Sequence, residues 1–311
     1  MRILITGSSG QIGTNLSLAL LAAGHEVRGV DHRPNPWTGE IETDVVDLAE
    51  LSAAPASYAP PWRPDCLVHL AAHAKVYELV LEPGKALENV RMVSAALELA
   101  RAADCPVVFG SSREVYGDIR RHLTEEGMAD FVVAESPYSA SKIAGEAFCY
   151  AYAKCYGLPV LVFRFSNVYG RFDNDAERME RVIPLFLRRI ADGEPITVYG
   201  RGKMLDFTYV DDCVAGIVAG VEAIADGKIS KDTINLAYGL GNTLEDLVGL
   251  LERALGREAD VTWEESRVGE VTRYVADVTK ARQMLGYQPQ VPLSQGIGRY
   301  VAWWREQGLL H

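Results

Sequence analysis

The sequence contains no apolar run approaching the roughly 20 residues that a membrane-spanning helix needs, and its start, MRILITG, lacks the pattern of a secretory signal. Cysteine is also scarce, and no two of its five cysteines have CxxC spacing, which argues against zinc binding and redox chemistry. Buried thiols in a reducing compartment are the simplest interpretation. We therefore expect a soluble, cytoplasmic protein with no metal site and no membrane partner.

Basic residues are also fewer than acidic ones. The chain has 31 Lys and Arg against 42 Asp and Glu, a formal net charge of −11. Such a surface repels phosphate backbones, so we expect no nucleic-acid partner, although a local basic pocket could still hold one small phosphorylated ligand. The length of 311 residues allows one large domain with a smaller cap.

Short apolar runs alternate with amphipathic segments through the first half of the chain. Strands are expected at 2–7, 26–31, 41–46, 65–71, 106–112 and 159–170, with helices at 11–23, 84–103 and 137–156. This alternation predicts an α/β fold with a doubly wound parallel sheet of the Rossmann type. After residue 170 the pattern loosens, with helices expected at 242–256 and 294–307. We predict a dinucleotide-binding domain at 1–170. Residues 171–311 should form mainly a substrate-binding cap, interleaved with the last strands and helices of the first domain.

The first expected site is the glycine-rich turn GSSGQIG, which directly follows the first strand. Glycines there let a pyrophosphate approach the helix N-terminus. The expected cofactor-binding residues of this turn are Gly7, Gly10, Gln11, Ile12 and Gly13. Asp31 ends the second strand, where a carboxylate binds both ribose hydroxyls of NAD and repels the 2′-phosphate of NADP. Arg33 is the counter-argument for NADP, but Asp31 lies closer to the strand, so NAD is the expected cofactor.

The second expected site is SPYSASK, where Ser136 and Pro137 open a helix. Tyr138 and Lys142 are then one turn apart on the same helical face. A free phenol titrates near 10, so a base at neutral pH needs a drop of roughly three units, about 4 kcal/mol. A nearby ammonium favours the phenolate, and Lys142 together with a positive nicotinamide could supply that drop.

Together with HLAA (69–72), the serines that end the 106–112 strand and DFTYVDD (206–212), these motifs resemble the extended short-chain dehydrogenase/reductase family. More narrowly, the chain is similar to NAD-dependent nucleotide-sugar epimerases and dehydratases. The resemblance implies Tyr138 as base, Lys142 as its partner and Ser112 as the hydroxyl that bonds the reacting sugar oxygen. It also implies cofactor contacts from Asp44, Val45, Leu70, Ala71, Ala72, Asn89 and Phe165, besides Tyr138 and Lys142.

The resemblance further implies that a nucleotide diphosphate lies between the sheet and the cap. The residues expected to touch it are Asn167, Arg181, Val182, Val198, Tyr199 and Arg267. An arginine suits a pyrophosphate because its planar fork donates two bonds. One departure matters: relatives often carry a second arginine just before DFTYVDD, where this chain has Leu205. Arg201, Lys203 or Arg181 could replace it, or the diphosphate could lie differently.

Arg113 and Glu114 follow Ser112 and distinguish between reactions. Dehydratase relatives have Asp then Glu here, an acid and a base for elimination. Arg113 stays cationic and cannot donate a proton at pH 7, which disfavours an ordinary dehydratase. Glu114 also occurs in decarboxylating relatives. The pair could face the sugar, with Arg113 binding substrate and Glu114 catalytic, or the two side chains could simply pair with each other.

Epimerisation at C4 through a transient 4-keto sugar needs only NAD, Tyr138, Lys142, Ser112 and room for the sugar to rotate, so it is the expected reaction. UDP is the expected nucleotide by family frequency. A UDP-sugar decarboxylase or atypical dehydratase using Glu114 is the main alternative. An NADPH-dependent reductase and a non-catalytic nucleotide sensor are further alternatives, and the intact Tyr138, Lys142 and Ser112 oppose the sensor. The resemblance also implies a homodimer formed through the helices at 84–103 and 137–156.

Overall fold

The computed structural model describes residues 1–117, 134–173, 181–265 and 272–310. At its centre is a seven-stranded sheet in which all neighbouring strands are parallel. The strand order is β10-β6-β5-β4-β1-β2-β3. The winding direction reverses between β1 and β4, where doubly wound sheets bind their ligands. The strands are β1 (Arg2–Thr6), β2 (Glu26–Asp31), β3 (Thr43–Val45), β4 (Cys66–His69), β5 (Val107–Ser112), β6 (Val160–Phe165) and β10 (Lys231–Leu236). This confirms the predicted fold class.

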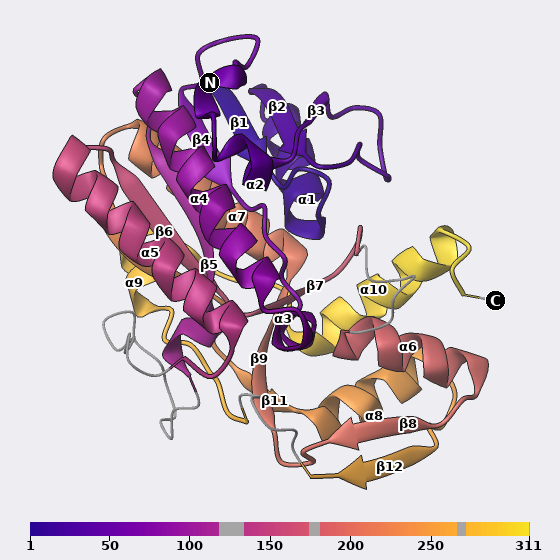
Figure 1. The fold of residues 1–311 in the computed structure, drawn as a ribbon. Coiled ribbons are helices and arrows are strands. Elements are labelled where there is room, and N and C mark those ends of the chain that lie inside the picture. Colours follow the sequence, from indigo (N-terminus) through magenta and orange to yellow (C-terminus); the bar gives the residue numbers. More distant parts are fainter. Residues whose placement is uncertain (118–133, 174–180, 266–271, 311) are drawn as a thin grey trace.

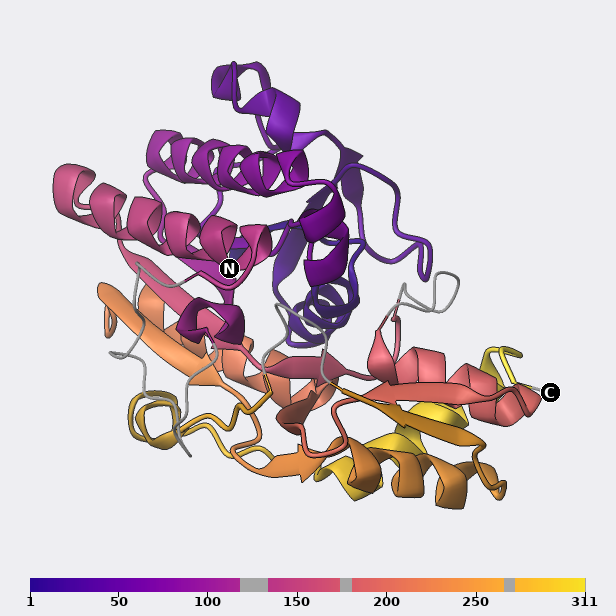
Figure 2. The same cartoon turned by 60° about the horizontal axis from the view of Figure 1, so that its bottom comes forward.

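Helices cover both faces of this sheet. On one face α4 (Gly84–Ala103) and α5 (Pro137–Tyr156) lie side by side, while α1 (Gln11–Ala22) packs against α7 (Val210–Ala225) on the other (Figures 1 and 2). Both faces of the central strands are therefore buried, and β4, β5 and β6 are buried at every position. Such strands read as continuous apolar runs.

A smaller lobe lies beyond the carboxyl ends of the strands (Figure 1). It has a three-stranded sheet ordered β11-β9-β7 and a two-stranded sheet of β8 and β12. Its strands are β7 (Asn167–Tyr169), β8 (Ile196–Tyr199), β9 (Met204–Tyr209), β11 (Gly241–Thr243) and β12 (Val261–Glu264). Its helices are α6 (Val182–Asp192), α8 (Leu244–Leu255) and α10 (Leu293–Glu306). The buried rings of α10, among them Trp304 and Tyr300, join this lobe to the common core.

The structure divides one expected strand. The strand expected at 159–170 is two strands, because the chain leaves the large sheet after Phe165 and enters the three-stranded sheet at Asn167. The helix α7 and the strand β10 come from the second half of the chain, and both belong to the layers of the main sheet. The domain division at residue 170 itself stays a prediction.

The remaining helices are short: α2 (Leu48–Leu51), α3 (Val76–Leu81) and α9 (Thr279–Leu285), with single 3₁₀ turns η1 (Pro55–Ser57) and η2 (Arg113–Tyr116). Within the described ranges, every helix is too short or too polar to span a bilayer.

Candidate active site

The glycine turn has the geometry that close approach of a ligand requires. Gly7 has a φ of +77°, and a Cβ there would lie 2.6 Å from the backbone N of Ala71, so only glycine fits. A Cβ on Gly13 would collide with the Gly7 carbonyl oxygen. Gly10 caps α1 without a side chain, so the first N–H groups of α1, from Gln11 and Ile12 onward, have no side-chain cap. This is the arrangement in which a helix N-terminus accepts a pyrophosphate.

Asp31 is held at the end of β2 by the turn. Its carboxylate accepts hydrogen bonds from the backbone N–H of Ser9 at 3.0 Å and of Arg33 at 3.3 Å. The contact of Arg33 with Asp31 is thus made by the Arg33 backbone N–H. A fixed carboxylate next to the glycine turn suits ribose hydroxyls and opposes a 2′-phosphate.

Asp44, an expected adenine contact, is engaged by protein groups. Its carboxylate accepts hydrogen bonds from Arg28 Nε at 3.0 Å and Tyr58 OH at 2.7 Å. The hydrogen bond from Arg28 holds the pKa of Asp44 below its usual value. The neighbouring Val45 side chain is exposed. The structure thus places both residues at the end of β3, and their role toward adenine stays a prediction.

The segment after β4 is anchored by Asn89 of α4. Asn89 Oδ1 accepts a hydrogen bond from the His73 backbone N at 2.7 Å, and its Nδ2 donates to the His73 carbonyl and to Ser141 Oγ of α5, both at 3.1 Å. This fixes the path of the expected cofactor contacts Leu70, Ala71 and Ala72. Asn89 is therefore a structural tie between α4, α5 and that segment.

The expected catalytic residues lie together at the end of β5. Ser112 lies close enough to Tyr138 for its hydroxyl to lower the pKa of Tyr138, and Lys142 Nζ donates a hydrogen bond to the Gly110 carbonyl at 2.8 Å. The Lys142 ammonium lies 5.8 Å from the centre of the Tyr138 ring. All three side chains are nearly buried. A Cβ on Gly110 would lie 2.9 Å from both Leu70 and Phe165, so these two side chains flank the strand end.

Burial dominates the protonation of the pair. Burial raises the pKa of Tyr138 to about 12, although the Ser112 hydroxyl and the charges of Arg113 and Arg181 lower it in part. Burial also lowers the pKa of Lys142 to about 8. In this structure the phenol is thus protonated at neutral pH. The base role requires the pKa of Tyr138 to fall in the loaded site.

Arg113 and Glu114 do pair with each other, at 2.9 Å between Arg113 Nη2 and Glu114 Oε1. The Arg113 guanidinium also lies over the ring of Tyr274, 5.6 Å from its centre. Ser112 Oγ accepts the backbone N–H of Glu114 at 3.2 Å, which begins the η2 turn. The ion pair therefore sits directly beside the Ser112 hydroxyl.

Several expected substrate contacts are tied to the protein framework. Arg181, which precedes α6 and its first residue Val182, donates to Gln11 Oε1 at 3.2 Å and to Asp173 Oδ1 at 3.0 Å. It thereby links the cap to the cofactor turn. Asn167 Nδ2 donates to the Asp206 carbonyl at 2.9 Å. These side chains are placed between the two lobes, where a diphosphate is expected.

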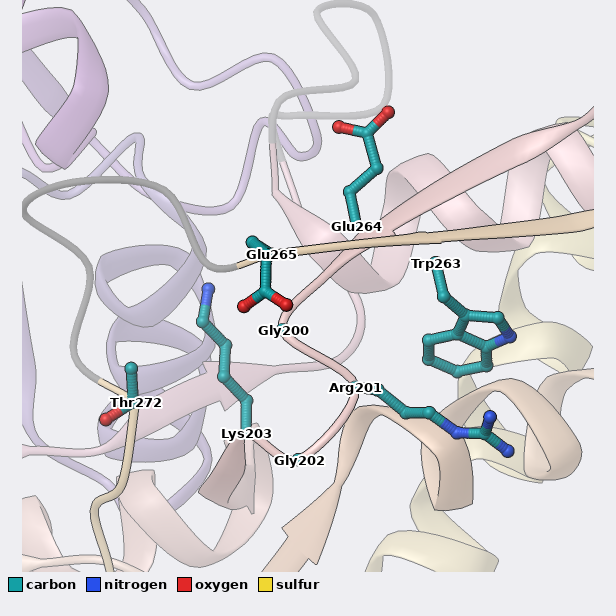
Figure 3. Close-up of a pocket in the computed structure, with 8 residues that line it drawn as sticks. All are labelled: Gly200, Arg201, Gly202, Lys203, Trp263, Glu264, Glu265 and Thr272. Carbon is teal, nitrogen blue, oxygen red and sulfur yellow. The ribbon is translucent and has the colours of Figure 1, made fainter.

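A cavity of about 660 Å³ opens beside β8, whose last residues are the buried Val198 and the half-buried Tyr199. Figure 3 shows its lining, with Lys203 extending toward Glu265 and Arg201 toward Trp263. The lining residues are Gly200, Arg201, Gly202, Lys203, Trp263, Glu264, Glu265 and Thr272. Arg267 lies outside the described residues, but the flanking Glu265 and Thr272 both line this cavity.

The cavity also bears on what replaces the arginine missing at Leu205. Arg201 is exposed and forms a 2.7 Å ion pair with Glu245. The Lys203 side chain is buried within the cavity lining. Which of the two would contact a phosphate stays a prediction.

The chain resembles known proteins over nearly its whole length. The NAD dependent epimerase/dehydratase family matches residues 3–237. The chain belongs to this family. A UDP-glucose 4-epimerase of Mycolicibacterium smegmatis is 32% identical, covering 99% of each chain. UDP-glucuronic acid decarboxylase 1 of Xenopus tropicalis is 29% identical over 98% of this chain and 72% of its own length. The crystal structure of the Thermotoga maritima UDP-glucose 4-epimerase with UDP-glucose has a TM-score of 0.89 at 27% identity, covering 99% of each chain.

Membership in this NAD-dependent family makes NAD the cofactor, as Asp31 indicated. The structure adds buried polar residues that the sequence reasoning missed. Asp206 accepts three backbone N–H groups, those of Tyr238, Gly239 and Ala276. The Glu146 carboxylate accepts hydrogen bonds from Ser111 Oγ of β5 and from the Arg164 side chain of β6. The DFTYVDD motif pointed to Asp206, whereas nothing local in the sequence joined Glu146 to its partners.

Proposed function

We propose that this epimerase-family protein interconverts UDP-hexoses or UDP-hexuronates at C4, through a transient 4-keto sugar. The observation that carries the proposal is the assembly of Ser112, Tyr138 and Lys142 at one strand end, beside the glycine turn. Arg113, at the position of the dehydratase acid, supports epimerisation over elimination because an arginine supplies no proton at neutral pH.

The residues at the switch point fit NAD. The backbone of the Gly7–Gly13 turn would hold the pyrophosphate and Asp31 a ribose, with Phe165 beside the reactive ring. Bound NAD supplies reversible hydride acceptance from C4 and a positive charge in the site.

The chain's own residues then handle the proton and the sugar. The Tyr138 oxygen takes the C4 hydroxyl proton and returns it after the sugar has turned over. Ser112, which lies beside Tyr138, holds the C4 oxygen. The Lys142 ammonium stabilises the phenolate. Lys203, Arg181 and Arg267 would hold the diphosphate, which leaves the sugar free to rotate about its linkage.

A decarboxylase or atypical dehydratase that uses Glu114 is the second candidate. One observation favours it: Glu114 is buried at the strand end, one residue from Arg113 and two from Ser112. The 29% identity to a UDP-glucuronic acid decarboxylase also supports it. In that reaction Arg113 would hold a carboxylate or a developing enolate.

We further propose a homodimer in the cytoplasm, formed through α4 and α5. Leu87 of α4 is 64% exposed and Phe148 of α5 is 40% exposed, which leaves large apolar side chains on the paired helices. The five cysteines are free thiols, as a reducing compartment requires. Sedimentation analysis would report the oligomeric state, and a monomer at micromolar concentration would contradict the dimer.

Incubation with a panel of UDP-hexoses and UDP-hexuronates, followed by NMR of the products, tests the function. A 4-epimer of the same mass is expected. A pentose product would establish decarboxylation, loss of water would establish dehydration, and net consumption of NADPH would establish a reductase. Absence of turnover with tight UDP-sugar binding would favour a nucleotide sensor.

A further inference from the structure

Three ionisable side chains lie along one face of α5 at intervals of four residues. They are Tyr138, Lys142 and Glu146, with exposed fractions of 7%, 6% and 1%. Residues four apart on a helix are direct neighbours. The first two belong to the proposed chemistry, whereas the hydrogen bonds of Glu146 are made with Ser111 and Arg164.

Glu146 is bound into the framework from two strands. Ser111 Oγ of β5 donates to its Oε1 at 2.6 Å, and Arg164 of β6 donates to Oε1 at 3.0 Å and to Oε2 at 2.7 Å. Arg164 in turn lies over the ring of Tyr116, 4.7 Å from its centre. Ser111 directly precedes Ser112 and follows Gly110, so Glu146 is hydrogen-bonded to the strand end that carries the site.

Lys142 needs a counter-charge because its own contacts are weak ones for an ammonium. Its hydrogen bond goes to a carbonyl, that of Gly110, and its other close groups are the rings of Phe109 and Tyr138. The titratable groups that face it from neighbouring positions are neutral at pH 7. Burial lowers the pKa of His69 on β4 to about 3 and raises the pKa of Cys149 on α5.

We propose that Glu146 is a positioning residue that keeps Lys142 protonated and directed at the Gly110 carbonyl, while its bond to Ser111 fixes the strand end on which Ser112 stands. Burial pulls the pKa of Lys142 down to about 8 even though the Glu146 charge opposes that fall. The Arg164 ion pair satisfies the remaining carboxylate oxygen, so the charge can stay in the interior.

The test follows Lys142 directly. NMR titration of protein labelled with ¹³C at lysine Cε, with the signal assigned through Lys142→Arg, gives the midpoint of its protonation. Glu146→Gln is expected to move that midpoint down by about one pH unit. Arg164→Gln is the matched control: it breaks the same ion pair but keeps the carboxylate, so the midpoint should stay or rise.

The opposite directions separate the proposal from a merely structural role, which would disturb both variants alike. If Glu146→Gln proves unstable, the double variant Glu146→Gln, Arg164→Gln keeps two amides able to bond each other and should still lower the midpoint. An unchanged midpoint in the Glu146→Gln protein, or equal falls in both single variants, would overturn the proposal.

A rate measurement adds a second readout, and this part rests on the proposed function. The alkaline limb of kcat/KM against pH should move to lower pH in Glu146→Gln by the same interval, and not in Arg164→Gln. Absence of turnover on every UDP-sugar would refute the proposed function, while the NMR midpoints would still decide the role of Glu146.

Discussion

Arg113 Nη2 lies 2.9 Å from Glu114 Oε1, so two sequence neighbours at the end of β5 form an ion pair beside Ser112. Arg113 Nη1 is buried and has no hydrogen-bond partner within the described structure. The pair therefore occupies one side of the guanidinium and leaves a donor available. In an epimerase Glu114 then serves to orient Arg113 toward a sugar hydroxyl or carboxylate.

The first prediction concerns Glu114. Glu114→Gln should lower the rate roughly tenfold in an epimerase, about 1.4 kcal/mol, because only the orientation of Arg113 suffers. If Glu114 transfers a proton at C5, removing it in a dehydratase or delivering it after CO2 leaves in a decarboxylase, the same change should cost on the order of 10³ or more. Steady-state rates of the variant measure the difference, and a loss near 10³ would promote the decarboxylase or dehydratase.

Solvent isotope incorporation provides a second prediction that needs no mutation. Turnover in deuterated water should place no deuterium on the sugar carbons, since the proposed reaction returns the hydride that it removed. Mass spectrometry and NMR of the product measure it. Deuterium at C5 would show that C5 had taken up a proton from solvent, as happens after elimination and after loss of CO2.

The third prediction concerns Tyr138. Tyr138→Phe should reduce turnover by roughly 10²–10⁴-fold or more, because the variant has no group to take the C4 proton. The ring stays, so folding and NAD binding should be largely intact, which thermal unfolding and NAD titration would check. Near wild-type turnover in this variant would refute the proposed chemistry.

The fourth prediction concerns cofactor choice. Asp31→Ala removes the carboxylate that Ser9 and Arg33 fix through their backbone N–H groups. The variant should lose much of its preference for NAD over NADP, because the repulsion of a 2′-phosphate is gone. Titration of both cofactors against wild type and variant measures this. Tighter binding of NADP than NAD by the wild type would contradict the role of Asp31.

The fifth prediction is a pH dependence of stability from Asp206. Burial raises the pKa of this carboxyl to about 7, although three backbone N–H groups oppose the rise. Between about pH 4 and pH 7 the Asp206 carboxyl therefore keeps its proton in the folded protein. In the unfolded chain, where its pKa is near 3.9, it has lost the proton. This contribution to the free energy of unfolding is full below about pH 4 and falls as the pH rises to 7, by at most about 1.4 kcal/mol per pH unit.

Asp206→Asn removes this titration. As the pH rises from 4 to 7, the wild type should lose free energy of unfolding relative to the variant, so its advantage over the variant should shrink. Chemical denaturation at several pH values measures it. A difference that stays constant across this window would show that Asp206 does not titrate there.

Local patterns predicted the parts of the protein that local physics determines. The glycine turn, Asp31 and the Tyr138–Lys142 spacing each follow from short-range geometry, and α4 and α5 have the expected bounds. The helix α7 was missed although its buried residues Val210, Val214, Ile217, Val221 and Ile224 recur at helical spacing. Its glycines Gly216 and Gly220 weaken a helix prediction. The strand β10 was missed because it begins with exposed polar residues.

Long-range pairing explains the other omissions. Glu146 meets Arg164 across 18 residues and Ser111 across 35, and Asp44 meets Arg28 across 16. Taken alone in the sequence, the charged residues of these pairs are typical of an ordinary surface. Their pairing depends on which strands and helices become neighbours, which the topology decides and a single sequence does not state.

The single residue between β6 and β7 has a consequence for how such proteins diversify. The chain passes from one sheet to the other at Ser166, returns where β9 runs directly into α7, and leaves again between β10 and β11. Within the described residues no single cut separates the two lobes, so the smaller lobe cannot be exchanged as one contiguous segment. A new specificity on this framework must then arise by replacing side chains in place.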